Sequence, residues 1–89
     1  MSNTINIKRS STSHVALLYL KMKNTFVTVE DVFQLSPSKY EHKYRAQRSL
    51  NTLVRQGLAI CRDNMYHITH EGKAACFKIV REQPAHAYE

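Results

Sequence analysis

The chain of 89 residues has room for one compact domain, and its hydrophobic fraction of 43% argues against extended disorder. Thirteen Lys and Arg residues against seven Asp and Glu residues give a net charge of +6, which favours a polyanionic partner. The longest apolar run is far too short to span a membrane. With no glycine-rich loop and few carboxylates, the sequence indicates neither an enzyme nor a bound cofactor.

The positive charge is concentrated in residues 36–62, which hold six basic residues and one acid, Glu41. The six are Lys39, Lys43, Arg45, Arg48, Arg55 and Arg62. A solvated helix face usually mixes both signs, so this local bias favours a polyanion more strongly than the total charge does.

The two ends of the chain differ in composition from its middle. Residues 1–11 are polar and predict a flexible basic arm or a short strand, and residues 84–89 predict a loose tail after Pro84. One folded domain is expected over residues 12–83. Cys61 and Cys76 lack paired spacing, which indicates reduced, buried thiols of a cytoplasmic protein.

The first helix is expected over residues 13–23, capped by Thr12 or Ser13. Its apolar stripe at helical spacing consists of Val15, Leu18, Tyr19 and Met22. Ala16, Leu17 and Leu20 leave almost every side apolar, so this helix is expected to be buried on more than one face.

Two more helices follow. Thr28 and Asp31 form a weaker version of a capping box before a short helix over residues 29–35. The third helix is the longest; it begins between residues 37 and 43 and ends at Gly57, which suits the left-handed position after a helix. Its expected core contacts are Ala46, Leu50, Leu53 and Val54.

A hairpin and a last helix complete the domain. Residues 58–62 and 65–69 are strand-like and flank the turn pair Asp63-Asn64. In this register the inner face holds Ala59, Cys61, Tyr66 and Ile68. Thr69 is expected to cap a helix over residues 70–82, with Phe77 off its packing stripe.

Three stretches carry a family resemblance: residues 27–32 (VTVEDV), 50–58 (LNTLVRQGL) and 66–73 (YHITHEGK). In the family concerned, stretches of these three kinds form the start of helix 2, the end of the recognition helix and the segment that follows the wing. In this order and spacing, the sequence resembles the winged helix-turn-helix regulators of bacteria and phages. The connection over residues 35–44 is longer than a tight helix-turn-helix, and the wing tip is only two residues.

The resemblance implies an α+β, mostly helical winged helix-turn-helix fold with a three-helix core, a short β-hairpin wing and a C-terminal helix. It also implies a sequence-specific, repressor-like regulator that binds double-stranded DNA in the cytoplasm, in association with the nucleoid. The recognition helix, at about residues 38–56, would enter the major groove while the wing meets the flanking backbone.

The expected DNA-binding residues are Lys39, Lys43, Tyr44, Arg45, Arg48, Asn51, Thr52, Arg55 and Arg62. Arg45 and Arg48 suit guanine and Asn51 suits adenine, because their side chains form two parallel hydrogen bonds with those base edges. Arg55 and Arg62 are expected to meet phosphates. Lys8 and Arg9 either follow the DNA or belong to a disordered basic start.

Other functions remain open. A homodimer would use surplus apolar residues, with Leu17, Leu20 and Phe77 as its expected contacts. A protein-interaction module would dock a partner on the same residues, and a DNA-architectural or replication-excision accessory factor would bend DNA instead. We expect no metal site, because the His and Cys side chains do not converge in the expected geometry.

Overall fold

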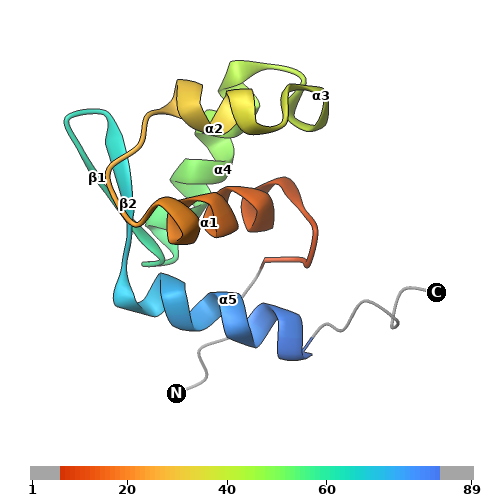
Figure 1. Cartoon of the computed structure of the whole chain (residues 1–89), viewed down its shortest axis with the longest axis vertical. Coiled ribbons are helices and arrows are strands. Elements are labelled where there is room, and N and C mark those ends of the chain that lie inside the picture. Colours follow the sequence, from red (N-terminus) through yellow and green to blue (C-terminus); the bar gives the residue numbers. More distant parts are fainter. Residues whose placement is uncertain (1–6, 83–89) are drawn as a thin grey trace.

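The computed structural model describes residues 7–82, which form a mostly helical α+β domain (Figure 1). Its elements are α1 (Thr12–Lys23), α2 (Val29–Leu35), α3 (Pro37–Tyr40), α4 (Lys43–Arg55), β1 (Ala59–Arg62), β2 (Met65–Ile68) and α5 (His70–Glu82). α1 packs across α4 and against α5, while α2 and α3 lie beyond the start of α4. The expected tail and residues 1–6 of the arm lie outside the described residues. Within residues 7–82, no helix is long and apolar enough to cross a membrane.

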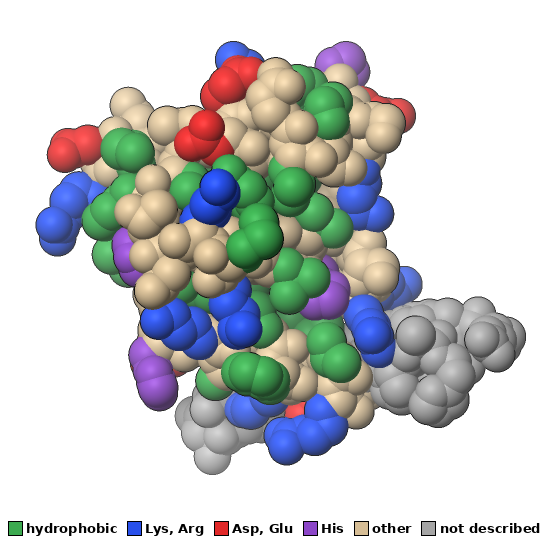
Figure 2. Space-filling view, in the orientation of Figure 1, with side chains coloured by type: hydrophobic (Ala, Val, Ile, Leu, Met, Phe, Trp, Pro, Cys, Tyr) green, Lys and Arg blue, Asp and Glu red, His purple; other side chains and the backbone are tan. Residues whose placement is uncertain are grey.

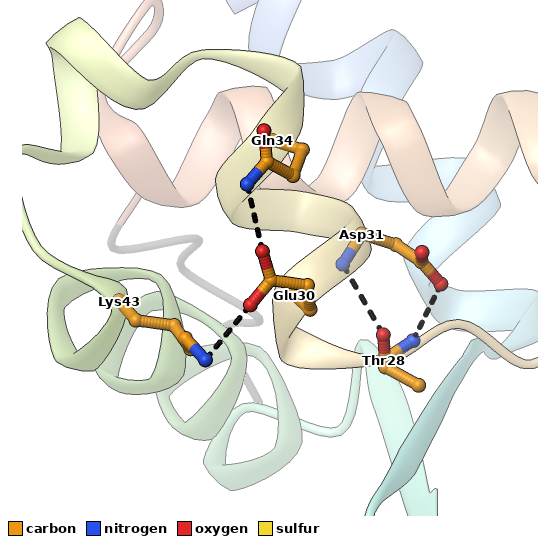
Figure 3. Close-up of polar contacts among 5 residues, drawn as sticks. All are labelled: Thr28, Glu30, Asp31, Gln34 and Lys43. Atoms are coloured by element: carbon orange, nitrogen blue, oxygen red, sulfur yellow. Dashed lines mark hydrogen bonds and ion pairs between the residues drawn. The ribbon is translucent and has the colours of Figure 1, made fainter.

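Local capping signals define the start of three helices. Thr28 caps α2: its hydroxyl accepts from the Asp31 N–H at 3.2 Å, and the Asp31 carboxylate accepts from the Thr28 N–H at 3.1 Å (Figure 3). The Thr69 hydroxyl accepts from the Gly72 N–H at 3.0 Å, as expected for the cap of α5. The cap of α1 is Ser11, one residue before the expected candidates, and its hydroxyl accepts from the His14 N–H.

α4 begins at Lys43, within the range expected for the start of the third helix, but residues 37–40 form a separate helix, so the recognition helix expected at about residues 38–56 begins later. α3 ends at Tyr40, and Glu41 has a left-handed backbone with φ 67° before α4 begins at Lys43. The tertiary structure imposes this break, because Tyr40 is fully buried and its hydroxyl donates to the Thr12 carbonyl at 3.0 Å. Burial raises the pKa of Tyr40 to about 12, so this hydroxyl remains a donor. Lys39 consequently belongs to α3 and not to the helix that carries Arg48.

The buried side of α1 differs from the expected stripe. Leu17 and Leu20 are fully buried, whereas Leu18 and Met22 are 42% and 67% exposed. The correction arises because α1 is apolar on almost every side, so its contacts with α4 and α5 decide which residues are covered. Ile7, from the expected flexible arm, is also buried in the core.

The hairpin has the expected register, with Ala59 opposite Ile68 and Cys61 opposite Tyr66. Its turn residues, Asp63 and Asn64, both have positive φ. Val27 forms a bridge on the other side of Tyr66, so β1 lies at the edge of the sheet. Beyond Ala59 the side chains of β1 are exposed, and Cys61 is therefore not the buried thiol that was expected.

Two glycines connect the hairpin to the helices. Gly57 follows α4 with φ 76°, the left-handed conformation expected there. Gly72, in the first turn of α5, lies so close to the Leu58 carbonyl that a side chain has no room. This close approach lets α5 pack under the hairpin, and it places Cys76 in the core, where burial raises the pKa of its thiol.

Candidate nucleic-acid interface

The outer side of α4 is a polar, exposed stripe opposite a buried one. Ala46, Ser49, Leu50 and Leu53 are buried against the domain. The exposed stripe, at helical spacing, consists of Tyr44, Arg48, Asn51 and Arg55. These are four of the nine expected DNA-binding residues, and one rigid helix brings them together.

Hydrogen bonds position the stripe on the side of the hairpin. The Gln47 side-chain amide donates to Asn51 Oδ1 at 3.0 Å and to the Tyr66 hydroxyl. The Tyr66 hydroxyl lies 3.5 Å from the same Asn51 oxygen. Because Tyr66 belongs to β2 and is buried, this network ties the orientation of Asn51 to the hairpin. Gln47 and Tyr66 were not among the expected residues, since their meeting depends on the packing of α4 against the sheet.

Two of the expected cations are paired with carboxylates. Lys43 forms an ion pair of 2.8 Å with Glu30 of α2, whose carboxylate also accepts from Gln34 (Figure 3). Hydrogen bonding to Lys43, and then to Gln34, lowers the pKa of Glu30. Arg45 forms an ion pair of 3.1 Å with Glu41. Both pairs are exposed, and their positive charge is consequently reduced but remains accessible.

The remaining basic residues have no carboxylate partner among residues 7–82. They are Lys39 on α3, Arg48 and Arg55 on α4, and Arg62 at the end of β1. Arg55 donates to the Thr52 hydroxyl at 3.4 Å, which holds it along the helix. Arg48 and Arg55 therefore provide the uncompensated positive charge of the exposed stripe.

An aromatic pair marks the start of α4. Tyr44 is 57% exposed and stacks on His42, with ring centroids 5.9 Å apart and an interplanar angle of 20°. Tyr44 is thus presented to solvent beside the positive residues. Lys39 and Arg62, which lie on α3 and at the hairpin tip, are not gathered into this stripe.

An open groove borders the stripe on the side away from the hairpin. Its lining residues are Thr12, Ser13, Arg45, Arg48, Ser49 and Thr52. Thr12 and Ser13 begin α1, and their proximity to α4 could not be expected from local sequence. Ser49 carried a usable signal, because it is a polar residue on the apolar side of α4, between Ala46 and Leu53.

The expected dimer residues require a correction. Leu17 and Leu20 are fully buried within the chain, so they cannot contact a second copy. Phe77 is 66% exposed on α5, with the Lys21 ammonium 5.0 Å from its ring centroid. Other exposed apolar residues on these two helices are Leu18, Met22 and Val80. We name these four residues, Leu18, Met22, Phe77 and Val80, the apolar face; Figure 2 shows apolar side chains over α1, with basic side chains among and below them.

The described cysteines and histidines do not form a metal-binding group. Within residues 7–82, no three His, Cys, Asp or Glu side chains gather closely enough to hold an ion. Comparisons of the chain with protein-family models, with curated proteins and with solved structures find no match. Any assignment of function therefore depends on the residues and their geometry.

Proposed function

We propose that this chain is a winged helix-turn-helix DNA-binding domain. In this interpretation α2 and α4 are the two helices of the motif, α3 lengthens the turn between them, and the hairpin is the wing. The support is the order of elements, together with a polar helix face that α1 and α2 leave open to solvent.

The particular function that we propose is a sequence-specific, repressor-like transcription regulator in the cytoplasm. One observation carries it: Arg48, Asn51 and Arg55 share an exposed stripe on one helix, and neither arginine has a carboxylate partner among residues 7–82. Arg48 would bind guanine and Asn51 adenine in the major groove. Arg55 and Arg62 would contact phosphates of the DNA backbone.

The salt dependence of affinity tests whether the chain binds duplex DNA through its charge. We expect log K for duplex DNA to fall linearly with log salt concentration, with a slope of about −0.9 for each phosphate contacted. Fluorescence anisotropy with a labelled random duplex measures this slope. An absence of binding at low salt would remove the proposal.

Sequence preference tests the role of α4 separately from charge. Selection of bound duplexes from a random pool should yield a motif, and Arg48→Ala should reduce the preference at one position of that motif. Arg55 is assigned to phosphate, so Arg55→Ala should instead lower the affinity for all duplexes by a similar factor. If the selected pool stays random, the chain binds DNA without reading it, as an architectural factor would.

The proposal includes a homodimer that uses the apolar face. Two copies would double the number of phosphate contacts, which a single small domain lacks for tight specific binding. Sedimentation of the purified chain with and without duplex DNA measures this association. The exposed Phe77 also favours a second candidate, a winged-helix protein-interaction module, in which Arg48 substitutions would leave partner capture unchanged.

A further inference from the structure

We propose that the groove between the start of α1 and the middle of α4 is an oxyanion site that binds a phosphodiester group of duplex DNA. The choice of DNA as the source of the phosphate rests on the proposed function. The site itself rests on donors, charge and rigidity that the described residues present together.

The first set of donors is the backbone at the start of α1. The Ser11 hydroxyl accepts from the His14 N–H at 3.2 Å, and the Ser11 carbonyl accepts from the Val15 N–H at 3.0 Å. The N–H groups of Thr12 and Ser13 have no partner within residues 7–82. Unpaired N–H groups at a helix start carry partial positive charge and are favourable donors to phosphate oxygens.

The second, independent sign is a buried hydroxyl on the opposite wall. Ser49 is only 4% exposed, lines the groove, and has no hydrogen-bond partner in the described part of the chain. Because the Ser49 side chain is nearly buried and lines the groove, a group that enters the groove can supply the hydrogen bond that its hydroxyl lacks within residues 7–82. The neighbouring Thr52 hydroxyl already donates to the Arg48 carbonyl at 3.0 Å.

The charge of the groove selects an anion. Arg45 and Arg48 both line it, and the only carboxylate paired with either one in the described structure is Glu41, which lies 3.1 Å from Arg45. The Arg48 guanidinium has no such partner. Arg45 would hydrogen-bond the phosphate, and the charge of the adjacent Arg48, whose guanidinium is assigned to a base, adds to the attraction. The groove therefore favours a phosphate over any neutral ligand.

The groove is also held rigidly. Tyr40 is fully buried, and its hydroxyl donates to the Thr12 carbonyl at 3.0 Å, which joins the start of α1 to α3. α1 packs across α4. The N–H groups therefore need no rearrangement to meet an anion.

The position of the groove is consistent with a DNA backbone. It borders the exposed stripe of α4 at Arg48, while the Gln47–Tyr66 network borders the stripe on the hairpin side. A duplex read by the stripe would thus have one strand held near the hairpin and the other at the start of α1.

A proline substitution removes one donor without removing the helix. Thr12 is the first residue of α1, where proline is tolerated, and Ser11 has ψ 169°, which is compatible with a following proline. We expect Thr12→Pro to weaken duplex binding roughly tenfold, the loss of one charged hydrogen bond, with an unchanged circular dichroism spectrum. Thr12→Ala keeps the N–H and should bind like the parent chain; equal affinities for the two variants would overturn the proposal.

Amide chemical shifts provide a readout that does not depend on DNA binding. We expect the Thr12 and Ser13 amide signals to move when inorganic phosphate is added to the full chain, and Ser49→Ala to reduce that phosphate affinity about threefold. A short duplex should move the same signals further. No movement with either probe overturns the site.

The outcomes separate the two proposals. If phosphate moves the signals but the duplex does not, the site takes free phosphate and DNA is excluded as its occupant. If Arg48→Ala lowers the affinity for the duplex while Thr12→Pro leaves it unchanged, the groove does not bind the phosphodiester, but the proposed function survives. If no duplex binds, the proposed function fails, and the phosphate titration still decides whether the groove holds an oxyanion.

Discussion

The outer side of α4 and the apolar face of α1 and α5 are both exposed, yet they are built differently. The stripe on α4 is polar, and its Asn51 and Arg55 side chains are held by hydrogen bonds. The apolar face exposes Met22 and Phe77 by two thirds, beside the Lys21 ammonium. The first surface presents guanidinium groups on a polar stripe, which suits an anion. The apolar face leaves apolar side chains in contact with water, and a second apolar surface would bury them. The two faces are therefore suited to different partners.

The largest expected effect comes from the contact between α5, which carries part of the apolar face, and the base of the hairpin. A Cβ added at Gly72 would overlap the Leu58 carbonyl and lie 2.7 Å from Ile68 Cγ1, so Gly72→Ala must displace α5 from the hairpin. We expect a loss of about 3 kcal/mol or more in the free energy of unfolding, measured by urea denaturation.

Gly57→Ala is the matched control for this substitution. Its added Cβ meets nothing within 4 Å, but the residue has φ 76°. The expected cost is therefore only the conformational one, about 1 kcal/mol. Equal costs at the two glycines would show that α5 does not need its close approach to the hairpin.

A charge reversal tests the polar stripe next. Arg48→Glu places an acid in the middle of the stripe, and we expect duplex affinity to fall roughly a hundredfold, because one attraction is lost and a repulsion is introduced. Lys73→Glu makes the same change in net charge on the exposed surface of α5. Anisotropy titrations at one salt concentration compare the two. A similar loss for both would mean that total charge, and not the stripe, determines binding.

A polar substitution tests the apolar face with a smaller expected effect. Phe77→Gln should weaken self-association about tenfold, measured by sedimentation, because it removes an exposed aromatic ring from the contact. Leu35→Gln is the control, since Leu35 is 45% exposed on α2, away from α1 and α5. If both variants associate like the parent chain, the apolar face is not the dimer contact.

The smallest expected effect is a pH dependence of stability beneath these surfaces. His14 is buried, and its Nδ1 accepts from the Ser10 N–H at 2.8 Å; burial, and then the charge of Arg9, lower the pKa of His14 from 6.5. Below that pH the unfolded chain binds a proton that the folded chain does not, so stability falls as pH decreases through this window. Urea denaturation at about pH 7.5 and about pH 5 should show a smaller difference for His14→Gln than for the parent chain. An unchanged difference would assign the effect to other groups.

Some parts of the site were predictable because a few neighbouring residues determine them. The Asn51 and Arg55 positions follow from the helical spacing of Leu50 and Leu53, which places polar residues opposite a buried side. The Lys43–Glu30 pair was not predictable, since α2 must pack against the start of α4 to form it, whereas the Arg45–Glu41 pair spans only four residues. The groove was missed for the same reason, because Thr12 and Ser49 are far apart in the chain.

The sequence by itself determined the caps at Thr28 and Thr69, the left-handed Gly57 and the register of the hairpin. Each depends on a hydrogen bond or backbone preference within a few residues. Only the tertiary structure decided the break after Tyr40, the burial of Leu17 and Leu20, and the exposure of Cys61. In α1 an almost uniformly apolar surface contains no signal for which side is covered, so packing against α4 and α5 made that choice.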